Sequence, residues 1–324
     1  MLFSLLIACS ILDKPSQEEE KDPIKVDILI VMDNSASMWQ EGAVFGLNLE
    51  KLLEEQEDQA LDYQIGITTT SVEYTGSGSS DALEAGEAGL LIGNIITSND
   101  DEPIQQLREQ LLCDTVYWDV QSLLSPENQE PDYVCGDETE NISLQYLDCL
   151  CGTNGWESSQ GSGQEEPIEA ALLAACRTKS SAPESCYSSE SIFSAEDLGT
   201  NPALFRENTA ALIILIGDEG DASRRVENGS SDVTSYQEAF QFFQKHNFTF
   251  VAFGPDFNMS TNTLVCNNGG ATDWATQRFY LMSEGWAGNE GLYFPLETQN
   301  ESGACELANF SEYLTEINSL MYDF

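Results

Sequence analysis

Three oxygen-bearing side chains follow a strongly apolar segment near the N-terminus. Asp33, Ser35 and Ser37 stand at alternate positions directly after this segment, and the residues between them, Asn34 and Ala36, are small enough to let the chain turn. Carboxylate and hydroxyl oxygens are hard ligands, which suit Mg²⁺, Mn²⁺ or Ca²⁺ better than thiophilic metals. The alternative interpretation is a helix N-cap, since Ser and Asn are favoured there.

A second aspartate has an equivalent place in the sequence. Asp218 follows the apolar run 210–216, with one glycine between them. Parallel strands of an open sheet end at one edge, and ligands bind in the crevice outside their carboxyl ends. We therefore expect Asp33 and Asp218 to meet there, which favours a divalent-cation site over a cap.

The apolar pattern predicts the elements that must position these residues. Continuous or alternating apolar residues indicate strands at 24–32, 63–67, 210–216, 248–253 and 292–294. Helical spacing is found around 44–53, 168–176, 240–243 and 310–320, with Pro167 suited to the first turn of the second of these helices. This alternation predicts an α/β fold with a doubly wound, mostly parallel sheet flanked by helices.

The stretch from about 76 to 160 lacks this pattern. It contains glycine and serine clusters, scattered acidic residues and half of the eight cysteines that follow Cys9. We expect a disulfide-pinned, irregular insertion within one domain over residues 24–324, rather than a separate domain.

The N-terminus is a short apolar segment that ends at Cys9. The sequence Leu6-Ile7-Ala8-Cys9 resembles the lipobox of bacterial lipoproteins, where cleavage precedes a cysteine that carries the lipid anchor. The resemblance implies a signal peptide over 1–8, acylation of Cys9 into a lipid bilayer, and an acidic tether over 9–23. Because Ser10 follows the cysteine, the expected location is the outer membrane of a bacterial envelope, facing the periplasm or the exterior.

The remaining cysteines predict disulfides. The chain has nine cysteines, and eight remain if Cys9 is acylated: Cys113, Cys135, Cys149, Cys151, Cys176, Cys186, Cys266 and Cys305. An even set in an exported chain suggests up to four disulfides. Zinc is the alternative, but with a single histidine in the chain it would need four thiolates. Local pairing favours Cys176 with Cys186 and Cys266 with Cys305, and leaves the other four to pair among themselves.

The charge of the chain argues against a nucleic-acid partner. Fifty-six acidic and twelve basic residues give a formal net charge of −44 over 324 residues. This charge would repel phosphate backbones and anionic lipid headgroups. The chain is nevertheless 41% hydrophobic and only 21% charged, so it can bury a full core.

Taken together, these features resemble a known family. The motif Asp33-x-Ser35-x-Ser37 after an apolar strand looks like the metal-ion-dependent adhesion site of von Willebrand factor A domains, and the likeness extends over roughly 24–321. The segments 32–38, 161–165 and 218–223, with Cys266 and Cys305, are similar to exported bacterial lipoproteins that carry such a domain. The resemblance implies the sheet, a bound divalent ion and a binding role.

The resemblance also implies a set of metal ligands. The family's site usually takes a threonine from a loop before a central helix, but the corresponding loop here, 162–166, contains none, and Glu165 is the best-placed substitute. Asp218 fits the family's second aspartate, while Glu219 and Asp221 are expected outside the ligand set or towards solvent. The expected ligands are Asp33, Ser35, Ser37, Glu165 and Asp218, around one divalent cation, Mg²⁺ or Ca²⁺, with Mn²⁺ as a further candidate.

The expected function is an envelope-anchored, divalent-metal-dependent protein-binding or adhesion module, not an enzyme. A carboxylate of the protein ligand would complete the metal shell. Two alternatives stay open: an extracytoplasmic metal-dependent hydrolase, and a scaffold whose ion is purely structural. A Ser-His-Asp centre would have to use His246, the only histidine, which the pattern places at a helix-to-strand turn remote from the carboxyl edge of the sheet.

Overall fold

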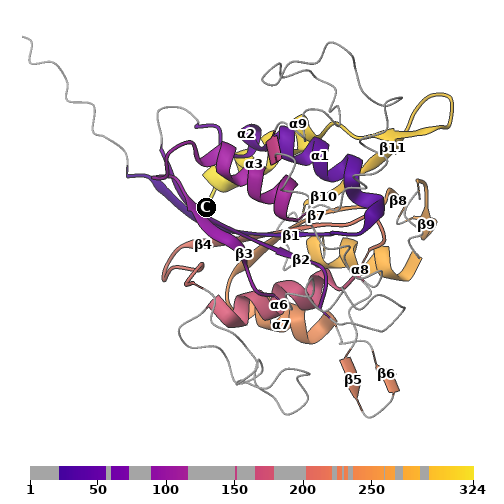
Figure 1. Cartoon of the computed structure of the whole chain (residues 1–324). Coiled ribbons are helices and arrows are strands. Elements are labelled where there is room, and N and C mark those ends of the chain that lie inside the picture. Colours follow the sequence, from indigo (N-terminus) through magenta and orange to yellow (C-terminus); the bar gives the residue numbers. More distant parts are fainter. Residues whose placement is uncertain are drawn as a thin grey trace, which may run out of the picture.

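A six-stranded sheet forms the centre of the molecule (Figure 1). The computed structural model describes residues 22–55, 60–72, 89–115, 150–151, 165–178, 202–220, 225–227, 230–232, 236–258, 260–266, 273–284 and 292–324. In spatial order the strands are β10 (Leu292–Pro295), β7 (Phe248–Gly254), β4 (Ala210–Ile216), β1 (Ile24–Met32), β2 (Leu61–Thr69) and β3 (Ile92–Thr97). Neighbouring strands are parallel except β2 and β3, which are antiparallel.

The two central strands are apolar because both of their faces are covered. The last seven residues of β1 and the last six of β4 are buried. Val26, Ile28 and Ile30 of β1 face one hydrophobic cluster, while Leu29 and Val31 face the other. This confirms the prediction of a mostly parallel sheet with buried central strands.

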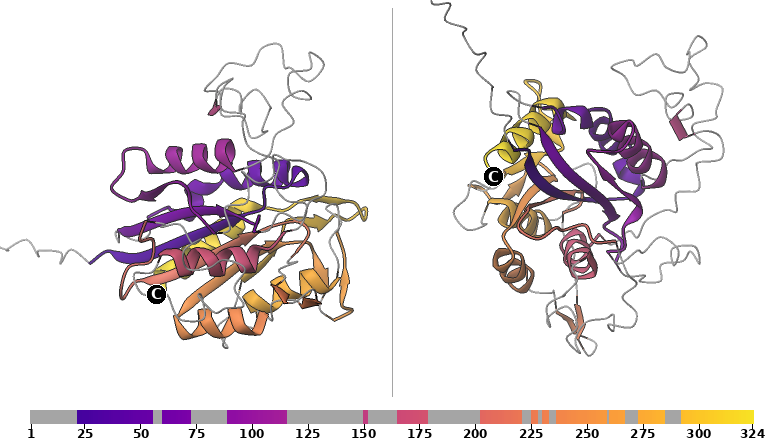
Figure 2. Two further views of the ribbon diagram at one scale, coloured as in Figure 1. Left: turned by 60° about the horizontal axis from the view of Figure 1, so that its bottom comes forward. Right: turned by 90° about the vertical axis from the view of Figure 1, so that its left-hand side faces the viewer.

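Helices cover both faces of the sheet (Figures 1 and 2). One layer contains α1 (Trp39–Leu47), α2 (Leu49–Leu52), α3 (Pro103–Asp114) and α9 (Phe310–Tyr322). The opposite layer contains α6 (Pro167–Thr178), α7 (Tyr236–Lys245) and α8 (Asp273–Glu284). A short 3-10 helix, η1 (Ala36–Met38), connects the end of β1 to α1. None of the helices in the described ranges is long and apolar enough to cross a membrane.

Part of the stretch expected to be an irregular insertion is regular. β3 and α3 both lie between residues 76 and 160, and both pack onto the core. The apolar sequence pattern of these two elements is weak because some of their buried side chains are polar and form hydrogen bonds with residues far away in the sequence. The Arg108 guanidinium donates to the Gly46 carbonyl and the Gln110 amide donates to the Ile92 carbonyl, so α3 is tied to α1 and β3 by hydrogen bonds as well as by leucines.

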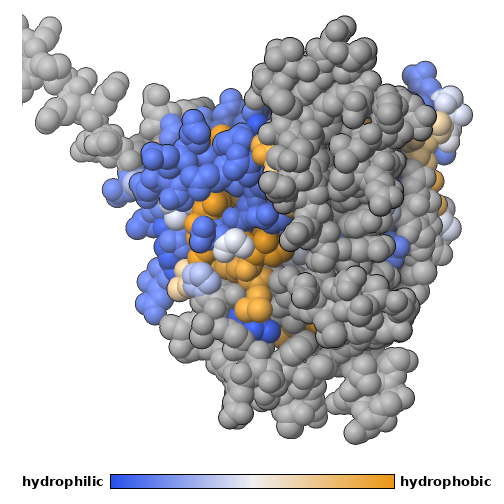
Figure 3. Space-filling view, in the orientation of Figure 1, coloured by the Kyte–Doolittle hydropathy of each residue, from blue (hydrophilic) through white to orange (hydrophobic). Residues whose placement is uncertain are grey.

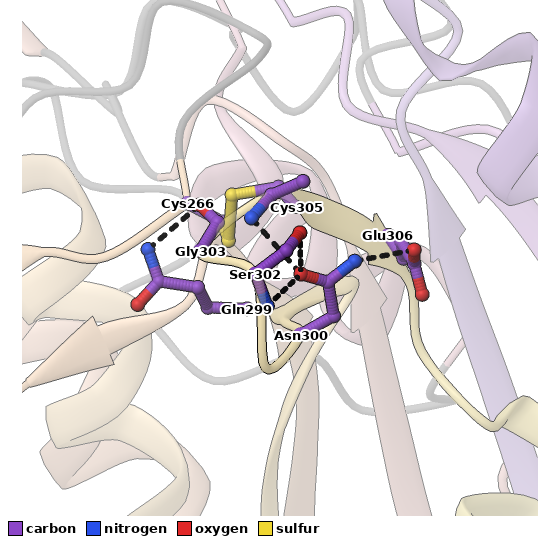
Figure 4. Close-up of a disulfide and its surroundings, with 8 residues drawn as sticks. Cys266, Gln299, Asn300, Ser302, Gly303, Cys305 and Glu306 are labelled. Carbon is purple, nitrogen blue, oxygen red and sulfur yellow. Dashed lines mark hydrogen bonds between the residues drawn. A yellow bond between two sulfur atoms is a disulfide. The ribbon is translucent and has the colours of Figure 1, made fainter.

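Among the described residues, three small hairpins stand outside the main sheet. They are β5 (Arg225–Glu227) with β6 (Ser230–Asp232), β8 (Phe257–Asn258) with β9 (Thr263–Leu264), and β11 (Glu297–Gln299) with β12 (Cys305–Leu307). The segment after β9 is joined to β12 by the predicted disulfide Cys266–Cys305 (Figure 4).

The other described cysteines are also oxidised. Cys113 at the end of α3 is bonded to Cys151, which agrees with pairing among the four cysteines left over from the local pairs. Cys176 is disulfide-bonded to a partner outside the described residues. Cys9, Cys135, Cys149 and Cys186 lie outside the described ranges, as do the expected signal peptide over 1–8 and most of the expected tether over 9–23. Disulfides of this kind indicate a non-reducing, extracytoplasmic location.

An ion-pair cluster fixes the amino end of the sheet. Arg206, in the segment before β4, donates from Nε to Asp27 Oδ1 and from Nη1 to Asp62 Oδ1, both at 2.7 Å. Asp27 lies in β1 and Asp62 in β2, so one guanidinium holds three neighbouring segments together. The fully buried Asp27 carboxylate therefore has a counter-charge.

Candidate metal centre

Three carboxylates meet beyond the carboxyl ends of β1 and β4. One oxygen from each of Asp33, Glu165 and Asp218 lies within 4.8 Å of the other two. Asp33 directly follows β1, Asp218 is the second residue after β4, and Glu165 is the second residue before α6. Asp33 and Glu165 are buried, and Asp218 is half-buried. We call these three residues the acidic triad.

Backbone hydrogen bonds fix how the strand ends converge. The Asp33 amide donates to the Ile216 carbonyl at 2.9 Å, and the Gly217 amide donates to the Phe253 carbonyl at 3.1 Å. The Glu166 amide donates to the Thr70 carbonyl at 3.0 Å, which attaches the start of α6 to the end of β2. The triad is thus placed by rigid main-chain contacts.

The two predicted serines belong to the same cluster. The Ser35 amide donates to Asp33 Oδ1 at 2.7 Å, the Ser35 and Ser37 hydroxyls are 2.9 Å apart, and the Ser37 hydroxyl is hydrogen-bonded to Asp218. Ser35 is buried and Ser37 is exposed. The cap residue of α1 is Met38, without a side-chain cap bond, so these serines do not cap that helix. All five residues predicted as ligands lie together.

Several triad oxygens have neither a hydrogen-bond donor nor a cation beside them among the described residues. Within the described ranges, no donor reaches Asp33 Oδ2, either carboxylate oxygen of Glu165, or Asp218 Oδ1. Asp33 and Glu165 can bond to each other only if one of them keeps a proton. Burying several unpaired carboxylates is costly, and the usual remedies are a proton or a bound cation.

The pKa values reflect this arrangement. Burial raises the pKa of Asp33, although hydrogen bonds to Glu165 and Ser35 oppose the rise. Burial, followed by the charge of Asp33, holds the pKa of Glu165 well above its usual range. The same two causes, in the same order, raise the pKa of Asp218 to about 8, against the effect of the Ser37 hydrogen bond.

A glycine leaves space beside the triad. A Cβ atom on Gly217 would lie 3.3 Å from Asp33 Oδ2 and 3.5 Å from Glu165 Oε2. A Cβ atom there would make a tight contact with Asp33 and an ordinary van der Waals contact with Glu165. Three carboxylates, two hydroxyls and this free space fit a hard divalent cation, which is bound by oxygen ligands at roughly 2.0–2.6 Å.

Glu41, which was not predicted as a site residue, is a buried carboxylate in the helix that follows the 33–37 loop. It is the third residue of α1 and is 7% exposed, and no donor among the described residues reaches its Oε2 atom. Burial, then the charges of Glu297 and Asp33, raises its pKa to about 7. An acidic residue in the first turn of a helix is common because it suits the helix dipole, so the sequence alone gives no reason to single it out.

The other described acidic residues near the motifs are not members of the triad. Glu166 is buried but is not among its members. Burial and the charge of Asp33 raise the pKa of the half-buried Glu219, which directly follows Asp218 in the chain. Asp221 lies outside the described residues.

The single histidine is far from this edge of the sheet. His246 follows the end of α7 and precedes β7, and its ring contacts the Phe242 ring with 4.8 Å between centroids. It therefore lies at the amino end of a strand whose carboxyl end is on the triad's side. A Ser-His-Asp centre that includes the triad aspartates would be incompatible with this placement.

Comparison with known proteins gives only remote likenesses. No protein-family model matches the chain, and no curated protein matches it. Similar solved structures include the pilus adhesin SpaC from Lactobacillus rhamnosus GG in an open conformation, with 11% identity over 94% of this chain and 30% of that chain and a TM-score of 0.40. The conserved hypothetical protein BatB from Bacteroides thetaiotaomicron has 14% identity over 92% of this chain and 100% of that chain, with a TM-score of 0.38.

A third similar structure is proximal thread matrix protein 1 from the mussel byssus, with 12% identity over 94% of this chain and a TM-score of 0.37. The present chain spans about half of that protein, 49% of its length. At such identities and TM-scores the likeness concerns the fold at most. The function has to be argued from the triad and its surroundings.

Proposed function

We propose that this protein is a von Willebrand factor A-type module that holds one divalent cation at Asp33, Ser35, Ser37, Glu165 and Asp218 and binds a protein partner there. The observation that carries the proposal is a cluster of three carboxylates in which Asp33 Oδ2, both Glu165 oxygens and Asp218 Oδ1 are buried without a donor among the described residues. The contrast with Asp27, which is equally buried but paired with Arg206, supports a missing cation rather than a general tolerance of buried acids.

A bound divalent cation would offset two of the three carboxylate charges and offer a coordination position to an oxygen atom of the partner. Mg²⁺ and Ca²⁺ are the leading candidates, because the donors are all oxygens. In this proposal the triad and the two serines hold the ion. The backbone hydrogen bonds of Asp33, Gly217 and Glu166 keep these ligands in place before a partner binds.

The test is the removal of one ligand. Asp33→Ala should abolish binding of Mg²⁺, Mn²⁺ and Ca²⁺ in calorimetry, because it removes a triad carboxylate, while circular dichroism shows an intact sheet. Asp323→Ala is the matched control, since it removes an exposed carboxylate at the end of α9. Undiminished ion affinity in Asp33→Ala would end the proposal.

We propose binding rather than catalysis, and the same variant separates a binding role from a purely structural ion. A metal-dependent binding module loses partner capture from envelope extract both in chelator and in Asp33→Ala, while the variant stays folded. A structural ion predicts lost thermal stability and no loss of capture. Turnover of a phosphoester or glycoside panel by the wild type, absent in Asp33→Ala, would support a hydrolase instead.

Anchoring to the envelope is a second part of the proposal. The disulfides support export, and Cys9 in its lipobox-like context supports acylation and an outer-membrane location. Cys9→Ala should move the protein from the membrane fraction to the soluble fraction on cell fractionation. Unchanged membrane association in this variant would refute lipid anchoring.

A further inference from the structure

A hydroxyl group just beyond β2 holds the loop that carries three of the expected metal ligands. The Ser71 hydroxyl donates to Asn34 Oδ1 at 2.9 Å, and both residues are buried although they are 37 positions apart in the sequence. Asn34 stands between Asp33 and Ser35 and is not among the expected ligands. The hydrogen bond therefore reaches the ligand loop from a neighbouring strand, at a residue outside the ligand set.

The residue before Ser71 contacts both chain segments that bear buried carboxylates. The Thr70 amide donates to the carbonyl of the residue that precedes Asp33, at 3.1 Å. The Thr70 carbonyl accepts from the amide of the residue that follows Glu165, at 3.0 Å. Thr70 and Ser71, which we call the bridging segment, thus connect the loop after β1 with the start of α6.

The contact between Ser71 and Asn34 is the one among these three that uses side chains, so it can be removed without changing the backbone. Without the Ser71 hydroxyl, the Asn34 oxygen would be buried without its donor, which costs free energy unless the residue turns towards water. Such a turn would move the Ser35 amide, which donates to Asp33 Oδ1 at 2.7 Å. The Asp33 carboxylate would then lose its fixed orientation.

We propose that Ser71 is a positioning residue of the metal centre: through Asn34 it orients the loop over 33–37 before an ion binds. This inference rests on the proposed function and deepens it, because it adds a residue that determines which divalent ions the site retains. Mg²⁺ requires near-ideal octahedral geometry, whereas Ca²⁺ accepts variable geometry. A loop without its fixed orientation should therefore lose Mg²⁺ before it loses Ca²⁺.

Calorimetric titrations of the full chain with Mg²⁺ and with Ca²⁺ test this role in Ser71→Ala. Removing a group that orients a metal ligand typically lowers metal affinity by about 10–100-fold. We expect Ser71→Ala to weaken Mg²⁺ binding by about ten-fold or more and Ca²⁺ binding by about three-fold or less. Ser71→Thr keeps the hydroxyl and should hold both affinities within about two-fold of the wild type.

Thr68→Val is the matched control. Thr68 lies in β2 and is fully buried, and its hydroxyl donates to the Leu90 carbonyl at 2.8 Å. The substitution removes a hydrogen bond of the same strand that does not reach the ligand loop, so it should lower stability and leave both ion affinities within about two-fold. Equal losses of Mg²⁺ affinity in Thr68→Val and Ser71→Ala would overturn the proposal, because general loosening of β2 would explain both.

A double-mutant cycle tests whether Ser71 acts through Asn34. Asn34→Ala removes the acceptor of the same hydrogen bond. The double variant should therefore bind Mg²⁺ within about two-fold of Ser71→Ala alone, since the bond can be broken only once. Losses of affinity that multiply in the double variant would show that the two residues act independently, and would overturn the proposal.

Hydrogen exchange of the ion-free protein gives a measurement that needs no metal. In chelator, the amides of residues 33–38 should exchange at least about five-fold faster in Ser71→Ala than in the wild type, and at the wild-type rate in Thr68→Val. Equal exchange in Ser71→Ala and the wild type would contradict the positioning role.

The outcomes also separate this inference from the proposed function. If the wild type binds Mg²⁺ and Ser71→Ala binds it equally tightly, the role of Ser71 is wrong and the metal site stands. If the wild type binds neither Mg²⁺ nor Ca²⁺, the proposed function falls and this inference falls with it. Circular dichroism of each variant establishes folding, and Asn34→Ala breaks the same hydrogen bond if Ser71→Ala does not fold.

Discussion

Two buried aspartates show how a residue's partners distinguish a structural from a functional role. Asp27 and Asp33 lie on the same segment, and both are 0% exposed. Asp27 accepts hydrogen bonds from the guanidinium and the amide of Arg206, whereas Asp33 lies in a cluster with two other carboxylates and its Oδ2 atom has no donor among the described residues. The charge of Asp27 is therefore balanced by an ion pair within the fold, while Asp33 belongs to a group that could hold a cation.

Glu165→Thr tests the residue at which the chain departs from the family pattern. Removing the third carboxylate should weaken Ca²⁺ binding by about ten-fold or more, because Ca²⁺ tolerates several carboxylates and the site loses one negative charge. In chelator the variant should be more stable than the wild type by about 1–3 kcal/mol, since a buried acceptor without a donor is removed. Calorimetry and denaturant unfolding measure the two effects.

The neighbouring acid provides the control for that substitution. Glu166→Thr removes an equally buried carboxylate that lies outside the triad. It should change Ca²⁺ affinity far less than Glu165→Thr. A larger loss in Glu166→Thr would mean that the ligand has been assigned to the wrong glutamate.

Glu41 makes the stability of the ion-free protein depend on pH. Burial raises its pKa from 4.5 to about 7, so the folded state holds this proton more tightly than the unfolded state does. The stabilising contribution is therefore complete below about pH 4.5 and is lost as the pH rises through about 7. In chelator at pH 8, the free energy of unfolding of Glu41→Gln should exceed that of the wild type by about 1–3 kcal/mol. At pH 4 the two free energies of unfolding should be equal. An equal gain at both pH values would contradict an ionised Glu41.

The elements that carry the site were more predictable than those at the periphery. β1 and β4 are covered on both faces, so their apolar runs are continuous, and the aspartates that follow them stand out. β3 is an edge strand with only Ile96 buried, and α3 buries Arg108 and Gln110 through hydrogen bonds to distant segments. Glu41 escaped notice because its surroundings come from contacts that no local pattern encodes.

At the scale of elements, the Cys266–Cys305 disulfide can be tested separately from the triad. It closes a separation of 39 residues between the segment after β9 and the β11–β12 hairpin. The hairpin has its own support, because Asn300 Oδ1 accepts from the Ser302 and Ala304 amides (Figure 4). Replacing both cysteines by serine should lower the free energy of unfolding by about 2–4 kcal/mol, as loop closure in the unfolded chain is lost.

The same double variant should retain its affinity for divalent ions within about two-fold, because the backbone bonds that place the triad come from β1, β4, β7 and α6. Denaturant unfolding and ion calorimetry on one preparation check both statements. Lost ion affinity with an otherwise folded protein would show that the hairpin helps to build the metal centre.

At the scale of the whole molecule, the many excess acidic side chains repel one another across the surface. The formal charge is −44, and the face shown in Figure 3 carries a broad hydrophilic area over α2 and α3 beside a smaller apolar one. Among the described residues, exposed large hydrophobic side chains are few: Val265, Leu307 and Phe324. Such a surface favours solubility and opposes self-association, but its self-repulsion lowers the stability of the folded state at low ionic strength.

Screening and specific binding should therefore stabilise the protein in two separable ways. Raising NaCl from about 10 mM to about 1 M shortens the Debye length from roughly 30 Å to roughly 3 Å, so the melting temperature of the chelated wild type should rise by several degrees. A divalent ion at micromolar concentration changes the ionic strength very little, and any further rise it causes must come from binding to the native state. Asp33→Ala should keep the full NaCl response and lose the micromolar response to Mg²⁺ or Ca²⁺, as measured by scanning calorimetry. If the variant retains the micromolar response, the ion acts on the acidic surface as a whole and not at the triad.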